Sequence, residues 1–341
     1  MDPLSQGALG AVLPLATRRR TQAAVAGGLG FIAGMMADLD VLIRSQTDPL
    51  LFLEYHRQFT HSLIFIPVGG LIAALLLHRP FRRWHGLTFL RTWMFCALGY
   101  GTHGLLDTAT SYGTVLLWPF SDERFSWSII SIVDPLFTLP VLTFAAVGVV
   151  RRNGAWGRAA LVWALVYLAL GVVQHRNALA MGDALAADRG HAPLRLEVKP
   201  SFANILVWKV IYETADRFHV DAVRAGIGPM VMPGTSVPRL DPVRDFPWLP
   251  AESRQARDIA RFARYSDGYV ARDPTRPDRV IDVRYSFVPN VIAPLWSIGL
   301  RPDAAPEAHV TFDTHRESVR ARLPDLWRMV VQPAARRDAA D

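Results

Sequence analysis

The chain has 341 residues and the composition of a folded protein with an apolar bias. Hydrophobic residues make up 51% and charged residues only 20%, which excludes a disordered or highly solvated chain. The net charge is +7, from 37 basic and 30 acidic residues, and the basic residues are nearly all arginine. Cys96 is the single cysteine, so an intramolecular disulfide and a cysteine-based zinc site are both excluded.

The first half of the chain contains a series of uncharged or nearly uncharged apolar runs. A helix that crosses a bilayer needs about 20 apolar residues, and several of these runs are at the short end of that range. The sequence predicts five spans, whose apolar cores are residues 21–37, 62–77, 92–106, 126–150 and 159–173. Buried helices of a large soluble α-helical protein are the alternative interpretation.

Arginine is distributed unevenly among the connections between these runs. Cytoplasmic loops of membrane proteins hold the excess of basic residues, so the arginine-rich connections are predicted to be cytoplasmic. This places the N-terminus in the cytoplasm and everything after the fifth span outside, on the periplasmic side. A cleaved signal peptide over the first run is the alternative. Because the predicted membrane topology accounts for the positions of the arginines, we expect no nucleic-acid partner. The arginine-rich connections carry Arg18, Arg19 and Arg20; Arg79, Arg82, Arg83 and Arg91; and Arg151, Arg152 and Arg158.

Beyond Gln174 charged residues become frequent and prolines cluster. Partial alternation of apolar and polar residues predicts strands, and one amphipathic stretch without proline or glycine predicts a helix at 252–265. The expected fold is therefore a membrane α-helical bundle of about five spans, residues 1–174, followed by a small soluble α+β domain, residues 175–341. The predicted strands are 194–198, 205–212, 217–223, 280–287 and 309–312.

Ionisable residues gather at three places where the chain is expected to enter or leave the membrane. Such groups are costly at membrane depth, so they usually face a protein interior or a water-filled cavity and mark function. Spans one and three exit on the outer side and span two enters from it, so the three clusters are predicted to meet at one membrane face. They are Asp38 with Asp40, the segment from His56 to Ser62, and His103 with Asp107.

The residue types in these clusters suit a divalent metal. Imidazole and carboxylate favour zinc most, and a carboxylate-rich set makes manganese or magnesium possible. His103 and Asp107 are four residues apart and share a helix face, although a local hydrogen bond explains such a pair equally well. Two aspartates at the end of the first span oppose the helix dipole there, which indicates a cation. The predicted ligands of one or two ions are Asp38, Asp40, His56, His61, His103 and Asp107.

Several residues near these clusters each have more than one candidate role. Arg57 is a candidate for holding an anionic substrate or for facing lipid headgroups, and Asp134 is a candidate ligand, ligand partner or helix break. Thr60 and Ser62 are interpreted as helix caps rather than nucleophiles. Tyr100, Thr108, Thr110 and Tyr112 are expected to line the cavity. Five further histidines show no ligand-like grouping: His175, His191, His219, His309 and His315.

The combination of motifs resembles the YdjM-like family of bacterial inner-membrane metal-dependent hydrolases. The most specific part is the string His56-Arg57-x-x-Thr60-His61-Ser62-Leu63, which follows Ala37-Asp38-Leu39-Asp40 and precedes His103-x-x-x-Asp107. The resemblance covers about residues 25 to 140. It departs from many relatives in having Ala37 before the first aspartate, where they carry proline. The family is distantly similar to zinc-dependent phospholipase C and P1-type nucleases, a fold-level analogy.

These observations predict a membrane-bound metal-dependent hydrolase in which a bound ion activates water against a phosphoester or lipid-linked substrate. Arg57 and Asp134 are the candidate catalytic residues, and membrane lipids are the expected partners. The alternatives are a non-enzymatic membrane protein that presents its outer domain to a partner, and a transporter, against which the absence of a sequence repeat argues.

Overall fold

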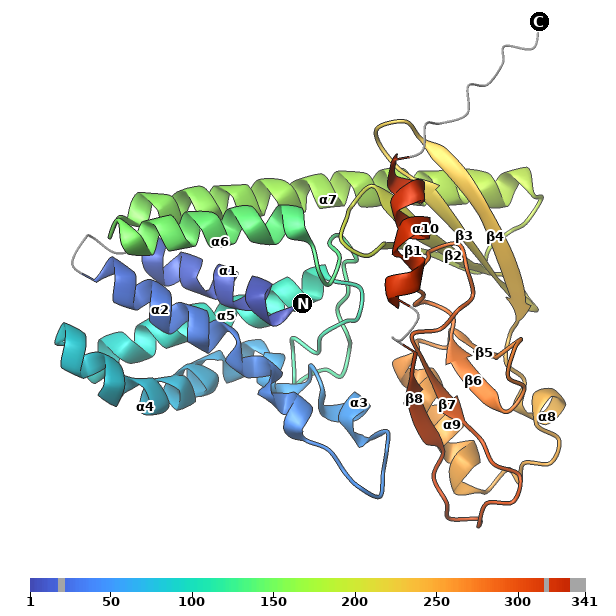
Figure 1. The fold of residues 1–341 in the computed structure, drawn as a ribbon. Coiled ribbons are helices and arrows are strands. Elements are labelled where there is room, and N and C mark those ends of the chain that lie inside the picture. Colours follow the sequence, from blue (N-terminus) through green and yellow to red (C-terminus); the bar gives the residue numbers. More distant parts are fainter. Residues whose placement is uncertain (18–21, 316–318, 332–341) are drawn as a thin grey trace, which may run out of the picture. The chain divides into compact units, whose positions relative to one another are not determined.

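The computed structural model describes residues 1–17, 22–315 and 319–331, and divides the chain into two compact units (Figure 1). The helical unit comprises Met1–Ile43, Tyr55–Val173 and Phe202–Asn204. The β-sheet unit comprises Arg44–Glu54, Gln174–Ser201 and Ile205–Asp341. The predicted cytoplasmic arginines at positions 18–20 lie outside the described residues.

The helical unit is a bundle of apolar helices, in which a long irregular segment joins α5 to α6. Helix α1 packs against α2, α5 and α6, and α4 packs against α5. A short 3-10 helix, η1, continues α2, and two more, η2 and η3, lead into α4. The elements are α1 (Pro3–Ala16), α2 (Ala23–Gly34), η1 (Met36–Leu42), η2 (Phe59–His61), η3 (Leu63–Phe65), α4 (Ile66–His85), α5 (Phe89–Ala109), α6 (Pro135–Val150) and α7 (Gly154–Asp188).

The expected count of five spans is not confirmed. Three segments of the described chain are long and apolar enough to cross a membrane: Ala23–Leu42, Leu63–Arg82 and Gly154–Asp188. Helix α6 is apolar but shorter, because the run from 126 begins as irregular chain and the helix starts only at Pro135. Helix α5 contains the third expected run but is not among the three. Helix α1, which was not predicted, packs inside the bundle although it is too short to span alone.

Helices α1, α2 and α5 approach one another closely around Gly30 of α2. A Cβ added to Gly30 would lie 2.3 Å from the carbonyl oxygen of Gly10 in α1, and a Cβ added to Gly99 in α5 would lie 2.4 Å from the carbonyl oxygen of Gly30. Helices in membranes use such small residues to bring their backbones together. The bundle is therefore tightly packed where the ends of α2 and α5 approach the polar residues.

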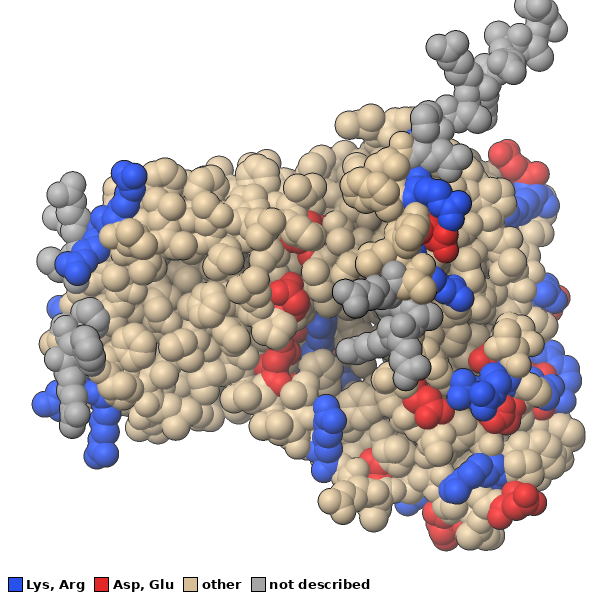
Figure 2. All heavy atoms as spheres, in the orientation of Figure 1, with Lys and Arg blue, Asp and Glu red and all other residues tan. Residues whose placement is uncertain are grey.

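Exposed arginines gather at one end of the helical unit, which Figure 2 shows in blue. They lie at the end of α4, at the start of α5 and around the turn between α6 and α7. Helix α4 ends and α5 begins at the arginine-rich end. The segment 56–62, which precedes α4, and the last turns of α5 therefore lie at the opposite end. The basic end and the polar clusters are thus separated by the length of the bundle. The exposed arginines are Arg79, Arg82, Arg91, Arg151, Arg152 and Arg158.

The β-sheet unit contains two antiparallel sheets of four strands each, in the orders β1-β2-β3-β4 and β5-β6-β7-β8. The last fifteen residues of α7 belong to this unit, together with the short α3 and α8 and the longer α9 and α10. The strands are β1 (Arg195–Pro200), β2 (Val207–Glu213), β3 (Arg217–Arg224), β4 (Met230–Pro238), β5 (Val270–Arg272), β6 (Arg279–Asp282), β7 (Trp296–Gly299) and β8 (Thr311–Thr314). The helices are α3 (Leu51–Tyr55), α8 (Pro242–Asp245), α9 (Arg254–Tyr265) and α10 (Val319–Val331).

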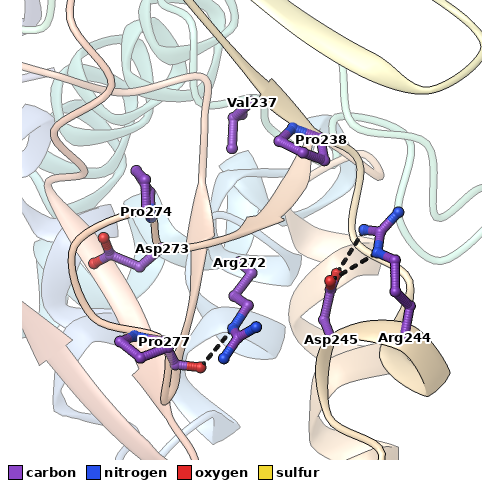
Figure 3. Close-up of a pocket in the computed structure, with 8 residues that line it drawn as sticks. All are labelled: Val237, Pro238, Arg244, Asp245, Arg272, Asp273, Pro274 and Pro277. Atoms are coloured by element: carbon purple, nitrogen blue, oxygen red, sulfur yellow. Dashed lines mark hydrogen bonds and ion pairs between the residues drawn. The ribbon is translucent and has the colours of Figure 1, made fainter.

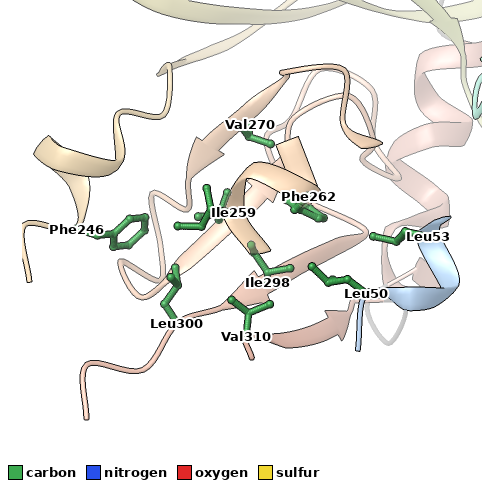
Figure 4. Packing of buried hydrophobic residues seen from close by; sticks show 10 residues of the cluster. Leu50, Leu53, Phe246, Ile259, Phe262, Val270, Ile298, Leu300 and Val310 are labelled. Carbon is green, nitrogen blue, oxygen red and sulfur yellow. The ribbon is translucent and has the colours of Figure 1, made fainter. Parts of the chain in front are cut away.

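A segment that precedes the second apolar run is built into the core of the β-sheet unit. Leu50 and Leu53 are buried together with Phe262 of α9 and Ile298 of β7, as Figure 4 shows. Arg261 of α9 fixes the same segment through bonds to Asp48 and Glu54. The connection between Asp40 and His56 is therefore anchored to the C-terminal part of the chain.

The predicted elements of the C-terminal half are mostly confirmed. The first three strands and the helix at 254–265 lie where the alternation and the amphipathic pattern placed them. The strand expected at 280–287 is shorter, because it pairs only as β6 (Arg279–Asp282), and the chain then turns away from the sheet. The strand expected at 309–312 lies slightly later, as β8 (Thr311–Thr314). Strands β4, β5 and β7 and helices α8 and α10 were not predicted.

Candidate metal centre

Four side chains from three separate elements converge in the helical unit. Asp38 lies on η1, His61 ends η2, and His103 and Asp107 lie one turn apart on α5. Each of the four offers one ligand atom, and these atoms all lie within 4.8 Å of one another. The side chains of His61, His103 and Asp107 have no exposed surface, whereas that of Asp38 is 22% exposed. Access to the group is therefore from the side of Asp38.

The nitrogen–oxygen distances within this group are close to those between the ligands of a four-coordinate ion. His61 Nε2 lies 3.4 Å from Asp38 Oδ1 and 3.2 Å from Asp107 Oδ2. His103 Nε2 lies 3.3 Å and 3.6 Å from the same two oxygens. In a tetrahedron whose metal–ligand bonds are about 2.0 to 2.1 Å, the ligand atoms are about 3.3 to 3.4 Å apart. The four nitrogen–oxygen distances are already close to that spacing, and the two remaining separations are within 4.8 Å.

Three of these atoms are buried without a hydrogen-bond partner among the described residues: His61 Nε2, His103 Nε2 and Asp107 Oδ2. Buried polar atoms are nearly always satisfied, and an orphaned one requires an explanation such as an ion. Carboxylates also outnumber cationic groups here, since Asp38, Asp40 and Asp107 face only Arg57 and the α-amino group of Met1. A divalent cation would satisfy the orphaned atoms and offset the excess negative charge.

Three of the four ligands are held by a hydrogen bond on the edge that faces away from the shared centre. His61 Nδ1 lies 2.9 Å from Thr60 Oγ1, and His103 Nδ1 lies 2.6 Å from the carbonyl oxygen of Gly34. Gln6 Nε2 of α1 donates to Asp107 Oδ1 at 2.9 Å. Partners of this kind fix the orientation and tautomer of metal-binding side chains. The two imidazoles are consequently oriented with Nε2 toward the shared centre.

Asp40 and His56 form a second, overlapping group with Asp38. Asp40 Oδ1 lies 2.8 Å from His56 Nδ1, while its Oδ2 accepts from the backbone nitrogen of Arg57 and from Thr60 Oγ1. These bonds occupy both oxygens of Asp40. The geometry therefore gives Asp40 the position of a residue that orients His56 and His61, in addition to membership of the second group.

Arg57 is buried beside the four ligand atoms. Its backbone has a φ of 61°, a left-handed conformation that is uncommon for a residue other than glycine. Its Nε lies 3.1 Å from Asp107 Oδ2, and its Nη1 donates to Thr110 Oγ1 at 3.1 Å. Strained backbone of this kind is often found at functional sites. The turn directs the guanidinium toward the candidate ligand Asp107.

Asp134 belongs to neither of the two groups. It is the N-cap of α6, where its Oδ1 accepts from the backbone nitrogens of Leu136 and Phe137, and it also accepts from the Tyr167 hydroxyl. A carboxylate satisfied in this way has a structural role at the helix start. This agrees with the alternative that Asp134 marks the beginning of a helix.

Two features of the site were not foreseen in the sequence. Gln6 supports Asp107 from α1, and its signal was a lone amide within the apolar stretch that precedes the first arginines. The expectation that Thr60 and Ser62 cap a helix is wrong, because neither side chain caps η3 or α4. Thr60 Oγ1 donates to Asp40 instead, and Ser62 Oγ donates to the carbonyl oxygen of Phe59.

The remaining histidines lie outside both groups, although two of them meet in the β-sheet unit. The rings of His191 and His219 have centroids 4.6 Å apart, and the His219 ring stacks on Tyr212 at 4.6 Å. His309 Nδ1 lies 2.7 Å from Asp258 Oδ2. Asp48 Oδ1 also lies 3.9 Å from His309 Nδ1, but within the part of the chain that the structure describes neither set forms a candidate metal group like the two in the helical unit.

A cavity of about 310 Å³ in the β-sheet unit is lined by charged side chains that already have partners. Figure 3 shows Arg244 paired with Asp245, and Arg272 donating to the carbonyl oxygen of Pro277. Because these groups satisfy one another, the cavity offers no unpaired charge to a ligand through them. The candidate centre of the chain is the one in the helical unit.

The model of the YdjM inner membrane protein family matches residues 1–178. This chain belongs to that family. The match contains every residue of the two metal-site groups and ends within α7, so the YdjM region corresponds to the helical unit with the first part of the β-sheet unit. Family membership confirms the resemblance inferred from the motifs.

A relative of known name is similar to part of the YdjM region. It is the inner membrane protein YbcI of Escherichia coli (strain K12), which is 36% identical over 107 residues, or 30% of this chain and 60% of YbcI. The chain thus matches about 60% of the length of that relative. No solved structure matches the chain. The YdjM family and this relative place the protein among inner membrane proteins.

Proposed function

We propose that this YdjM family member is a membrane-bound metal-dependent hydrolase that acts on a phosphoester or lipid-linked substrate. The observation that carries the proposal is the convergence of two imidazole nitrogens and two carboxylate oxygens, with nitrogen–oxygen distances of 3.2 to 3.6 Å, three of which atoms are buried without a hydrogen-bond partner among the described residues. A merely structural polar cluster would satisfy its own buried atoms.

Asp38, His61, His103 and Asp107 would hold the ion, with zinc favoured by two imidazoles and a four-coordinate spacing. Manganese or magnesium remains compatible with the carboxylates. When bound, the ion supplies Lewis acidity and lowers the pKa of a water molecule toward neutrality. The second group of Asp38, Asp40 and His56 could hold a second ion that shares Asp38.

The residues around the ligands prepare them for this role. Thr60 and Asp40 lie next to His61 Nδ1, which leaves Nε2 as the metal-facing nitrogen. Arg57 keeps a positive charge 3.1 Å from Asp107 Oδ2, where it stabilises the ionised carboxylate and would attract an anionic substrate. Burial of the two imidazoles excludes bulk water from all sides except that of Asp38.

The position of the polar group in the bundle supports a substrate at the membrane surface. The polar group lies at the end of the bundle opposite the exposed arginines, and arginine-rich ends are cytoplasmic in inner membrane proteins. The proposed site is therefore periplasmic, within reach of lipid headgroups. A phosphoester is the preferred substrate, because an arginine beside a metal favours the negative charge that develops on phosphate. The similarity to phospholipase C and P1-type nucleases stays a prediction.

The test is hydrolysis by the purified full chain in detergent, with phosphodiester, phosphomonoester and carboxylic-ester probes measured in parallel. We expect turnover of a phosphoester probe that is lost with a chelator and restored by zinc or manganese. The His61→Ala variant should have no such activity. A folded, metal-loaded protein that turns over none of the probes would favour a non-enzymatic membrane protein instead.

A further inference from the structure

Helix α10 packs on the β-sheet unit with only part of its apolar surface. Leu326 and Met329 are buried against Val207 of β2 and Ala222 of β3. These contacts fix the helix on the first sheet. They also determine which side of α10 faces outward.

The outward side of α10 carries a second row of apolar residues. Leu323, Trp327 and Val331 are 43%, 65% and 51% exposed, and their spacing of four residues places them along one helix face. We call these three residues the α10 stripe. Exposed apolar residues scattered singly are ordinary, but a row that includes a tryptophan marks an interaction surface.

A fourth exposed apolar residue lies near the C-terminal end of the stripe. Ile227 is 86% exposed at the turn between β3 and β4. Arg224 joins this turn to α10, because its Nε donates to the carbonyl oxygen of Gly228 and its Nη1 donates to that of Val330. The turn and the C-terminal end of α10 are thus held together as one surface.

Basic residues accompany the stripe. Helix α10 contains Arg320, Arg322 and Arg328 against the single acidic residue Asp325, with which Arg328 forms an ion pair. A helix with an apolar face, a tryptophan and an excess of arginine has the composition of helices that lie in the interface of an anionic bilayer. Tryptophan and arginine both favour the headgroup level, where one end of the side chain is apolar and the other is polar.

The chain's own neighbouring segments are poorly suited to cover the stripe. Residues 332–341 contain no Leu, Ile, Val, Met or aromatic residue, and residues 316–318 are Arg-Glu-Ser. Alanine and charged side chains bury too little apolar surface to compete with water for a leucine, a tryptophan and a valine. These two segments by themselves would leave most of the stripe unburied.

The chain passes directly from the helical unit into the β-sheet unit through one helix. Helix α7 has 35 residues, and its first part belongs to the helical unit while its end belongs to the β-sheet unit. Such a helix is about 52 Å long, whereas the hydrocarbon core is about 30 Å thick. Chain connectivity therefore allows the β-sheet unit to reach the surface of the bilayer that α7 would cross.

We propose that α10 is an interfacial helix, whose Leu323, Trp327 and Val331 insert among the headgroups of an anionic bilayer and dock the β-sheet unit on the membrane surface. The inference depends on membrane insertion of the chain and is independent of the proposed hydrolysis.

The test places a nitroxide label at single cysteines in the full-length protein, reconstituted in vesicles of phosphatidylglycerol and phosphatidylethanolamine. Cys96 is first replaced by alanine. The labelled variants are Leu323→Cys and Val331→Cys, which leave Trp327 in place, and the control is Val243→Cys on α8, an 81% exposed position in the same unit. The collision rates of each label with oxygen, which partitions into lipid, and with a water-soluble nickel chelate are compared.

We expect the ratio of the oxygen rate to the nickel rate to be several-fold higher at positions 323 and 331 than at 243. Addition of Trp327→Ser should lower that ratio at 323. Labels at 323 and 331 that are as accessible to nickel as the control would overturn the proposal. Dipolar broadening that disappears on dilution with unlabelled protein would also overturn it, because it would assign the stripe to a second copy of the chain.

Discussion

His61 Nε2 and Asp107 Oδ2 lie 3.2 Å apart in the interior of the helical unit, and neither atom has a hydrogen-bond partner among the residues described. His61 ends a short 3-10 helix, whereas Asp107 lies in the last turn of α5. A cation bound between two side chains that face each other in this way would satisfy both atoms. This relationship gives the first prediction.

Substitution of either residue should abolish metal binding. His61→Ala and Asp107→Ala each remove one of four ligand atoms, and we expect the metal content of the purified protein to fall from about one ion or more per chain to background. Elemental analysis of protein loaded with zinc measures this. The matched control is Asp134→Asn, because Asp134 is a buried carboxylate outside both groups and asparagine is an equally good N-cap. Full metal content in both alanine variants would exclude the proposed centre.

Loss of the Asp40 carboxylate should weaken the site without removing it. Asp40→Asn disturbs the bonds that orient His56 and His61, and changes at such supporting positions typically lower metal affinity by about 10- to 100-fold. Competition with a chromophoric chelator gives the affinity. Complete loss of the metal would show that Asp40 is itself an essential ligand.

The approach of α5 to His61 should not tolerate a larger residue at Gly104. A Cβ at this position would lie 2.2 Å from the carbonyl oxygen of His61, which is backbone and cannot rotate away. We expect Gly104→Ala to lower the free energy of unfolding by about 1 to 3 kcal/mol and to weaken metal binding. Gly101→Ala is the control, since its Cβ would meet only the flexible side chain of Ile66 at 3.3 Å. Equal behaviour of the two variants in thermal unfolding and metal titration would contradict the prediction.

Arg261 should hold the segment 44–54 on the β-sheet unit. Its guanidinium bonds Asp48, Glu54 and Asp258, so Arg261→Met leaves these carboxylates without their common partner. We expect faster hydrogen exchange in residues 44–54 and a loss of about 1 to 3 kcal/mol in unfolding free energy. Arg257→Met, on the same helix and paired only with the exposed Glu307, should change neither. Unchanged exchange in Arg261→Met would show that burial of Leu50 and Leu53 suffices.

Lys209 should make the stability of the β-sheet unit depend on pH. Burial lowers the pKa of Lys209 from 10.5 to about 7, although its ammonium donates to Ser286 Oγ and to two carbonyl oxygens. The folded chain therefore binds fewer protons than the unfolded chain between those two pH values, so the free energy of unfolding contributed by Lys209 rises with pH across that range. Lys209→Met should remove this rise, which thermal unfolding at neutral and alkaline pH would measure. A slope identical to that of the unsubstituted protein would contradict the assigned direction.

The sequence by itself determined which residues are available for the site and on which side of the membrane they are expected to meet. His103 and Asp107 share a helix face because they are four residues apart, and the alternation at 194–223 predicts three antiparallel strands that the structure contains. Local patterns of this kind depend only on the backbone period. The sequence also contains a signal for the start of α6, because Asp134 followed by Pro135 is typical of a helix N-terminus.

Only the tertiary structure decided how the polar residues divide their roles. Packing between separate elements determines that His61 turns Nε2 to Asp107 and Nδ1 to Thr60, and that both oxygens of Asp40 are already bonded. The support from Gln6 depends on α1 packing inside the bundle, which no spacing near the motif indicates. Composition and period specify which face of an element a residue occupies, whereas the contacts across elements arise from the close packing of all the helices together.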